Sequence, residues 1–212
     1  MFNLIHWVLG CFIVIFMMSG CSSDRHQERQ AHFQQWLQNN GKVKVLNTTA
    51  IIDDLVKQVG GEHVDTIVLI QGELDPHSYQ LVKGDDEKLA AAQIIFYNGL
   101  GLEHGPSLQT YLQKNPKSIA LGDLVDRQQA GRIIYVQGQK DPHMWMDISL
   151  WAKTIPFIVQ TLSEQDPEHA ADFQANGKKL QSEMEEAHLQ AIAIMHQVPS
   201  SKRFLVTSHD AF

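Results

Sequence analysis

Short apolar runs alternate with amphipathic segments from residue 42 onward. Residues 42–46 alternate polar and apolar side chains, which is typical of a half-buried strand. Residues 51–59 place their apolar side chains on one helical face, and Gly60-Gly61 ends that helix. Further runs predict strands at 64–70, 94–97, 118–121 and 133–136, and helices at 85–92 and 106–113. This alternation favours an α/β fold with a mostly parallel sheet flanked by helices.

Two helical stretches follow this alternating region. Asp147 is a favourable N-cap residue for a helix that reaches about Leu162, although Pro156 must kink or restart it. The second stretch runs over 166–197. Asn176-Gly177 inside it is a turn signal, so the pattern permits either one long helix or two stacked helices.

The chain closes on a short apolar segment and a polar loop. Arg203–Thr207 is predicted to be a buried strand, with Ser208-His209-Asp210 as the loop at its carboxyl end, where α/β proteins usually place their sites. We expect this strand to begin a second unit. The predicted organisation is a leader at 1–21, a polar tether at 22–41 with a helical turn at 31–37, a lobe at 42–162, a long linking helix at 163–199 and the start of a second lobe at 200–212.

The leader contains an apolar run at 7–18, which is shorter than the roughly 20 residues of a membrane-spanning helix. A signal peptide is therefore favoured, and small residues before Cys21 resemble the cleavage box of bacterial lipoproteins, with Cys21 as the acylated residue. Met18 stands where Leu is usual, and no Lys or Arg precedes the run, so an uncleaved membrane anchor is the alternative. Either form places the remaining chain outside the cytoplasm. The other cysteine, Cys11, also lies in the leader, so no disulfide is expected in the mature protein.

The composition limits the classes of protein to which the chain can belong. The chain has 212 residues, 43% of them apolar, which suits one or two globular domains. A net charge of -7, without a cluster of Lys or Arg, argues against a nucleic-acid-binding protein.

Two similar loops carry the candidate chemistry. Each contains Asp-Pro-His beside an aromatic residue, as LDPHSY at 74–79 and as DPHMWMD at 141–147. Proline restricts its own φ angle and the residue before it, so the imidazole is held at a rigid turn. His77, His143 and His209 each follow a predicted strand. One loop histidine is usually a surface residue, but three of them with a carboxylate suit zinc, manganese or iron.

The chain resembles the extracytoplasmic metal-binding proteins of ABC importers for zinc, manganese and iron, also called metal-binding lipoprotein adhesins. The matching segments are LDPHSYQLVKGDDEKLAAAQIIFYNGLGLEHG at 74–105, DPHMWMD at 141–147 and VTSHDAF at 206–212. The resemblance extends from about residue 42 to the end. In that family one long helix joins two α/β lobes and the metal lies between them, which favours a single helix over 166–197.

The resemblance also implies roles for the histidines. His77 and His143 would be the metal ligands of the first lobe, and His209 the first ligand of the second. The bound divalent cation would pass to an ABC permease, with no enzymatic reaction. The family's fourth ligand is an Asp or Glu later in the second lobe, and the sequence stops before it. We therefore expect a truncated chain with weakened metal binding.

Other polar and aromatic residues are expected near the site. Glu103 is expected to cap the following helix, Asp75 and Asp141 to shape their turns, and Asp147 to cap a helix. Ordinary helix-start and core-packing roles are the alternatives for the lining residues. The predicted lining residues are His104, Tyr79, Trp145 and Asp210.

The metal and the function class both retain alternatives. Residues 105–141 contain no histidine, whereas the zinc-specific branch often has a histidine-rich loop there, which favours manganese or iron. Three histidines with an open position also occur in zinc hydrolases, although no Asp or Glu stands out as a general base. A surface interaction lipoprotein that does not transport metal is the other alternative.

Overall fold

The computed structural model describes residues 30–72, 74–129 and 131–206. The chain divides into two units, 1–40 and 41–212, and each is described by itself. In the first unit, residues 30–36 are helical, which confirms the helical turn predicted there. The predictions for the leader, Cys21, His209 and Asp210 lie outside the described residues.

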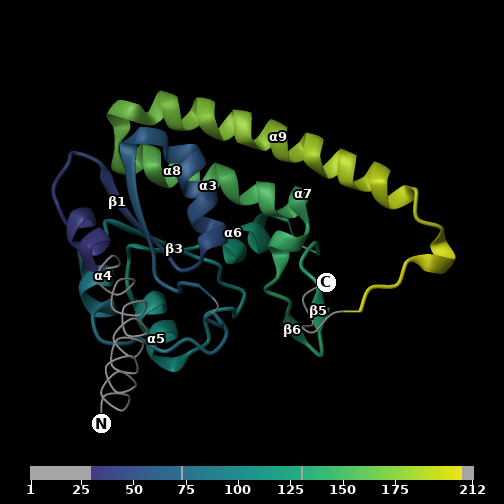
Figure 1. Ribbon diagram of the computed structural model, residues 1–212, viewed down its shortest axis with the longest axis horizontal. Coiled ribbons are helices and arrows are strands. Elements are labelled where there is room, and N and C mark those ends of the chain that lie inside the picture. Colours follow the sequence, from purple (N-terminus) through teal and green to yellow (C-terminus); the bar gives the residue numbers. More distant parts are fainter. Residues whose placement is uncertain (1–29, 73, 130, 207–212) are drawn as a thin grey trace, which may run out of the picture. The chain divides into compact units, whose positions relative to one another are not determined.

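A four-stranded parallel sheet forms the centre of the second unit (Figure 1). The strand order is β2-β1-β3-β4. Val43 pairs with Val64 at the start of the β1–β2 ladder, and Val45 pairs with Ile94 in the β1–β3 ladder. This sheet confirms the predicted α/β fold. Its strands are β1 (Val43–Asn47), β2 (Val64–Val68), β3 (Ile94–Tyr97) and β4 (Ser118–Ala120).

Helices cover both faces of the sheet (Figure 1). One face carries α3 (Ala50–Gly60), α8 (Ile155–Gln165) and α9 (Ala170–His196), and the other carries α4 (Asp85–Ala91) and α5 (Pro106–Lys114). Val45 and Phe96 point into the cluster beneath α3 and α8, while Leu46 and Ile95, which alternate with them, are equally buried. Burial of both faces explains the continuous apolar run of β3, IIFY.

Three short elements connect this framework. The turn η1 (Gly61–His63) joins α3 to β2. Helix α6 (Leu121–Gln128), which the sequence pattern did not predict, follows β4 directly. The predicted β segment at 133–136 is part of a separate antiparallel hairpin, β5 (Tyr135–Val136) and β6 (Gln139–Lys140). His143 therefore follows a hairpin and not a strand of the main sheet.

The predicted helix 147–162 is divided where proline suggested. It consists of α7 (Ile148–Trp151), the turn η3 (Ala152–Thr154) and α8. Pro156 occupies the first turn of α8, where its missing N–H group has no helical partner to lose. Pro156 therefore restarts the helix.

Helix α9 is continuous and follows the turn η4 (Pro167–His169). Its 27 residues span about 40 Å. A Cβ atom on Gly177 would lie 2.4 Å from Val159 Cγ2, so the glycine allows a close crossing of α9 with α8. Asn176 Nδ2 donates to the Val59 carbonyl at 3.1 Å. Asn176-Gly177 is thus a packing contact and not a turn, which confirms the single helix.

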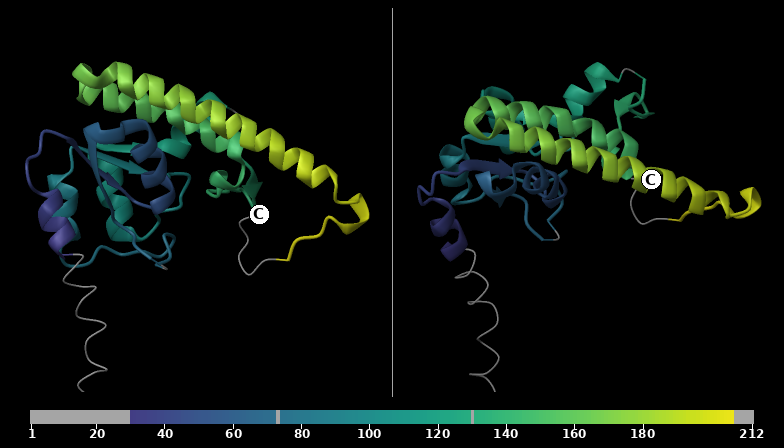
Figure 2. Two further views of the ribbon diagram at one scale, coloured as in Figure 1. Left: turned by 45° about the horizontal axis from the view of Figure 1, so that its top comes forward. Right: turned by 90° about the horizontal axis from the view of Figure 1, so that it is seen from above.

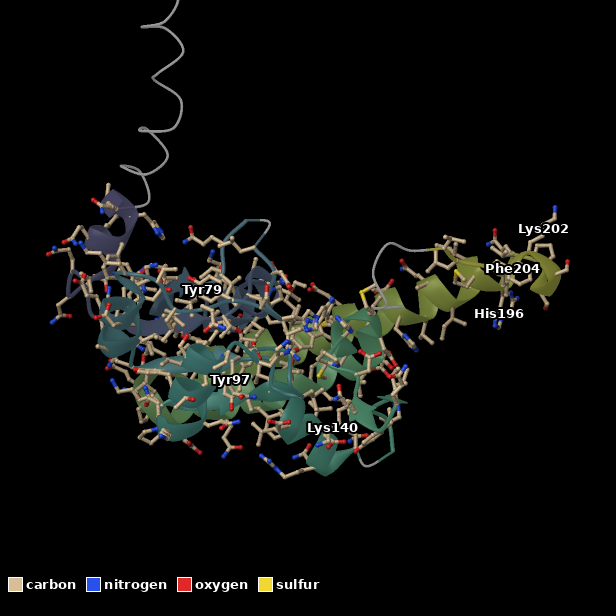
Figure 3. The ribbon with its side chains drawn as sticks, turned by 90° about the horizontal axis from the view of Figure 1, so that it is seen from below. Tyr79, Tyr97, Lys140, His196, Lys202 and Phe204 are labelled. Atoms are coloured by element: carbon tan, nitrogen blue, oxygen red, sulfur yellow. The ribbon has the colours of Figure 1, made fainter. Side chains whose placement is uncertain are left out.

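The two halves of α9 differ in burial. Phe173, Gly177 and Leu180 are buried in the first half, whereas Ile194 is 62% exposed in the second. In both views of Figure 2, α9 runs alongside α8 and continues beyond it. Figure 3 shows His196 and Phe204 at this far end. No helix within the described residues has the length and apolar character needed to cross a bilayer.

The predicted strand at 203–207 is wrong over its described part. The turn η5 (Ser200–Lys202) follows α9, and residues 203–206 form no strand. Phe204 is 84% exposed and Val206 is 95% exposed. A strand needs a paired neighbour to satisfy its backbone groups, and no described strand lies beside this segment.

Candidate metal centre

The first Asp-Pro-His loop follows β2 and is shaped by Asp75. Its Oδ1 atom accepts a hydrogen bond from the His77 backbone N–H at 2.9 Å. Its Oδ2 atom accepts from the Ser78 hydroxyl at 2.9 Å. This arrangement is an Asx turn, in which a side-chain carboxylate stabilises the backbone of the next residues. Asp75 therefore has the turn-shaping position expected from the sequence.

The second loop repeats this turn and adds a bond to the imidazole. Asp141 Oδ1 accepts from the His143 backbone N–H at 3.0 Å and lies 2.7 Å from His143 Nδ1. A carboxylate can only accept, so Nδ1 carries the proton and Nε2 of the neutral ring presents a lone pair. Asn98 Nδ2 donates to the Pro142 carbonyl at 3.0 Å, which ties this loop to the carboxyl end of β3.

The two loops bring His77 and His143 together. Their Nε2 atoms are 3.1 Å apart, although the residues are 66 positions apart in sequence. Two nitrogen ligands, each about 2.1 Å from a metal at angles of about 90–109°, would be about 3.0–3.4 Å apart. The observed distance therefore matches neighbouring positions on one metal ion. It also permits a hydrogen bond between the rings when a proton lies between them.

Two predicted lining residues adjoin this pair. The His104 ring centre is 5.5 Å from that of His77, and the ring centres of Trp145 and His143 are 5.2 Å apart in a T-shaped arrangement. Trp145 lies in the turn η2 (Met144–Met146). Within the described ranges, no three His, Cys, Asp or Glu side chains are grouped closely enough to hold a metal.

Tyr79, the third predicted lining residue, is directed toward α4. Its hydroxyl donates to Asp85 Oδ2 at 2.7 Å. Burial raises the pKa of Tyr79, and the bond to the Asp85 carboxylate raises it further. Figure 3 shows Tyr79 within the α/β part of the chain, far from the end of α9. The phenol thus anchors the loop that follows His77.

Glu103 organises the loop after β3. Its buried carboxylate accepts from the Thr48 hydroxyl at 2.7 Å and from the backbone N–H groups of Asn98 and Gly99 at 2.8 and 3.1 Å. Burial raises the pKa of Glu103, and these bonds partly oppose that effect. Because α5 has Gly105 as its N-cap residue, the helix-capping role predicted for Glu103 is wrong.

Asp147 caps α7 as predicted. It accepts from the backbone N–H groups of Ser149 and Leu150 at 2.9 and 3.2 Å, and Arg132 Nη2 donates to it at 3.0 Å. Burial acts to raise the pKa of Asp147, but its hydrogen bonds and Arg132 outweigh burial and lower it. A cavity of about 230 Å³ lies between this cap and the second loop. Its lining includes Ile133, Met144, Leu150, Asp141 and His143.

A second histidine pair was not expected from the sequence. His63 stacks on His169 with ring centres 3.8 Å apart. His63 Nε2 is 3.0 Å from Asp172 Oδ2, and His169 Nδ1 is 2.7 Å from Asp166 Oδ2. The bond to Asp166 raises the pKa of His169. The i, i+3 spacing of Asp166 and His169 was a local signal, but contact with His63 depends on packing over 106 positions of sequence.

Comparisons with known proteins agree with this fold. Residues 45–212 match the family model described as ZnuA, zinc-uptake complex component A, periplasmic. The chain belongs to this family. Its members are solute-binding proteins of ABC metal importers and not enzymes, which confirms that the chain is not an enzyme.

Two individual relatives illustrate how similar the chain is to known metal-binding proteins. It is 37% identical over 204 residues to "Metal-binding protein YtgA" of Chlamydia trachomatis serovar D, covering 96% of this chain and 60% of the relative. It is 29% identical over 201 residues to "Manganese-binding lipoprotein MntA" of Bacillus subtilis, covering 93% and 61%. The chain thus spans about 60% of the length of these relatives.

Solved structures show the same relationship. The crystal structure of Fe(III)-bound YtgA from Chlamydia trachomatis aligns with a TM-score of 0.78 at 40% identity, over 81% of this chain and 60% of that one. The periplasmic zinc-binding protein TroA from Treponema pallidum aligns with a TM-score of 0.75 at 28% identity, over 81% and 62%.

Proposed function

We propose that this chain captures a divalent transition-metal cation (zinc, manganese or iron) outside the cytoplasm for delivery to an ABC permease. His77, His143 and His209 are the proposed ligands. The observation that carries the proposal is the 3.1 Å separation of the His77 and His143 Nε2 atoms. Family membership and relatives named for manganese and iron binding support the same function.

The proposed mechanism is capture without covalent chemistry. The cation is the cargo, and it replaces any proton between His77 and His143 by binding both Nε2 electron pairs. Asp141 orients the His143 ring and fixes the tautomer in which Nε2 faces the cation. Three imidazoles alone should bind the cation more weakly than the same set completed by a carboxylate.

The proposed location is the outer surface of a membrane. Cys21 would be acylated, so the chain would be a periplasmic or membrane-anchored lipoprotein. Labelling with radioactive palmitate should mark the chain, and Cys21→Ser should abolish the label. Membrane association that persists without label would favour the uncleaved anchor. The division into a lobe at 42–162, a linking helix at 163–199 and a second lobe from 200 remains a prediction.

Isothermal titration of the full chain with zinc, manganese and ferrous ions tests the proposal. We expect one bound ion, with binding lost or strongly weakened in His77→Ala and His143→Ala. His196→Ala is a matched control, because His196 is an exposed histidine at the end of α9. Absence of binding to all three metals would favour a surface interaction lipoprotein without a role in metal transport.

A further inference from the structure

His104 lies on the loop between β3 and α5, and that loop is packed against the first Asp-Pro-His loop. A Cβ atom on Gly105 would lie 1.9 Å from the Tyr79 carbonyl oxygen, so the two backbones approach at a distance that only glycine permits. The Ser107 hydroxyl donates to Gln80 Oε1 at 2.9 Å. These contacts hold the two loops together, and the His104 ring lies beside that of His77.

The His104 ring has a defined orientation. Its Nδ1 atom is 3.0 Å from the Gly101 carbonyl oxygen, which can only accept a hydrogen bond. Nδ1 therefore carries the proton, and Nε2 of the neutral ring has a free electron pair. Asp141 gives His143 the same tautomer. Both rings thus present Nε2, the nitrogen through which a metal would bind.

Nearly the same geometry relates His77 to each of these neighbours. The ring centres of His77 and His104 are 5.5 Å apart with an interplanar angle of 51°. Those of His77 and His143 are 5.2 Å apart at 53°. His104 is exposed, so a cation arriving from solvent can reach it. The spacing differs from that of an assembled three-ligand site, which agrees with the lack of such a group among the described residues.

We infer that His104 is a third metal-binding imidazole, which joins His77 and His143 when a cation binds. This inference rests on the proposed function. An exposed side chain can change rotamer at little cost, and we expect a rotation of the His104 ring to bring Nε2 to the ion. The region before α7 would then supply three nitrogen ligands without His209.

The additional imidazole would also influence which metal binds. Imidazole suits zinc and iron, whereas manganese favours carboxylate and carbonyl oxygen. His104 should therefore strengthen the binding of zinc and ferrous ions more than that of manganese.

The test uses the full 212-residue chain with His209→Ala, purified in mild detergent, and cobalt as the probe. Each imidazole bound through Nε2 gives one exchangeable, cobalt-shifted Nδ1–H resonance in the proton spectrum. We expect three such resonances in His209→Ala and two after adding His104→Gln. Zinc affinity should fall at least about tenfold on that addition, whereas manganese affinity should fall less than about threefold.

Matched variants make the result interpretable. Adding His196→Gln to the His209→Ala chain should leave three resonances, and unchanged far-UV circular dichroism shows that each variant is folded. Two resonances both with and without His104, at equal zinc affinity, would overturn the inference and leave the proposed function intact. Absence of metal binding by the unaltered chain would overturn both.

Discussion

The two Asp-Pro-His loops share a turn, but their aspartates differ in the further hydrogen bonds that they accept. In each loop the aspartate accepts from the backbone N–H of the histidine, at 2.9 Å for Asp75 and 3.0 Å for Asp141. Asp141 uses the same oxygen to hold the His143 ring, whereas the second oxygen of Asp75 accepts from Ser78. The shared tripeptide therefore determines the backbone turn, and in the second loop its aspartate also orients the imidazole.

The loops also differ where they end. Asp85, at the start of α4, has a side chain that is 0% exposed and bonds to Tyr79 and Lys88. Asp147, before α7, has a side chain that is 42% exposed and bonds to Ser149 and Arg132. The first loop is thus anchored through buried polar contacts, and the second through a cap that faces solvent.

The largest expected effect is a loss of stability when Asp85, the buried anchor of the first loop, is removed. Asp85→Ala leaves the Tyr79 hydroxyl and the Lys88 ammonium group without this partner, and should lower the free energy of unfolding by about 3 kcal/mol. Urea denaturation measures the loss. Asp86→Ala, at the exposed neighbouring position, should change it by less than about 0.5 kcal/mol. Equal effects at the two positions would contradict this account of the first loop.

Asp141→Ala should have the next largest effect, on metal affinity. Without the bond to Nδ1, the His143 ring can rotate and change tautomer. The affinity for the metal should therefore fall about 10–100-fold, or about 1.4–2.7 kcal/mol. Asp75→Ala removes a turn contact and should weaken binding by less than about tenfold. Titration of both variants with zinc compares the loops, and a greater loss for Asp75→Ala would reverse the predicted order.

The solvent-facing cap at Asp147 should contribute less to the stability of the protein. Asp147→Ala should destabilise the protein by about 1 kcal/mol at neutral pH. Because folding lowers the pKa of Asp147, its contribution is present above the ordinary aspartate pKa and is lost as pH falls through the lowered pKa. The difference in unfolding free energy from the unaltered chain should therefore shrink below about pH 4. A difference that grows on acidification would contradict this sign.

Ser78→Ala should have the smallest effect. Ser78 is exposed, and its hydroxyl donates a hydrogen bond to the Asp75 carboxylate. We expect less than about 0.5 kcal/mol of lost stability and a change in zinc affinity within about twofold. Denaturation and titration of this variant measure both quantities. A larger loss of affinity would show that the first loop also depends on its second carboxylate bond.

The strands and most helices were predictable because their signals are local. The predicted strand 94–97 matches β3, and the predicted helix 51–59 lies within α3. Two glycines lie inside helices because of close packing. A Cβ atom on Gly122 would lie 2.7 Å from the Asn98 carbonyl oxygen, so this glycine within α6 permits close packing, as Gly177 does within α9. Close backbone approach and chain reversal both select glycine, and sequence does not distinguish them.

The sequence by itself determined the turns at Asp75 and Asp141 and the cap at Asp147, because each joins groups within three residues. The sequence also contains the motifs on which the family resemblance rests, and the comparisons confirm that resemblance. Only the tertiary structure decided that His77 and His143 meet at 3.1 Å and that His104 lies beside them. Those distances depend on how the sheet, its helices and the hairpin pack together, and such long-range packing is not encoded in any one segment.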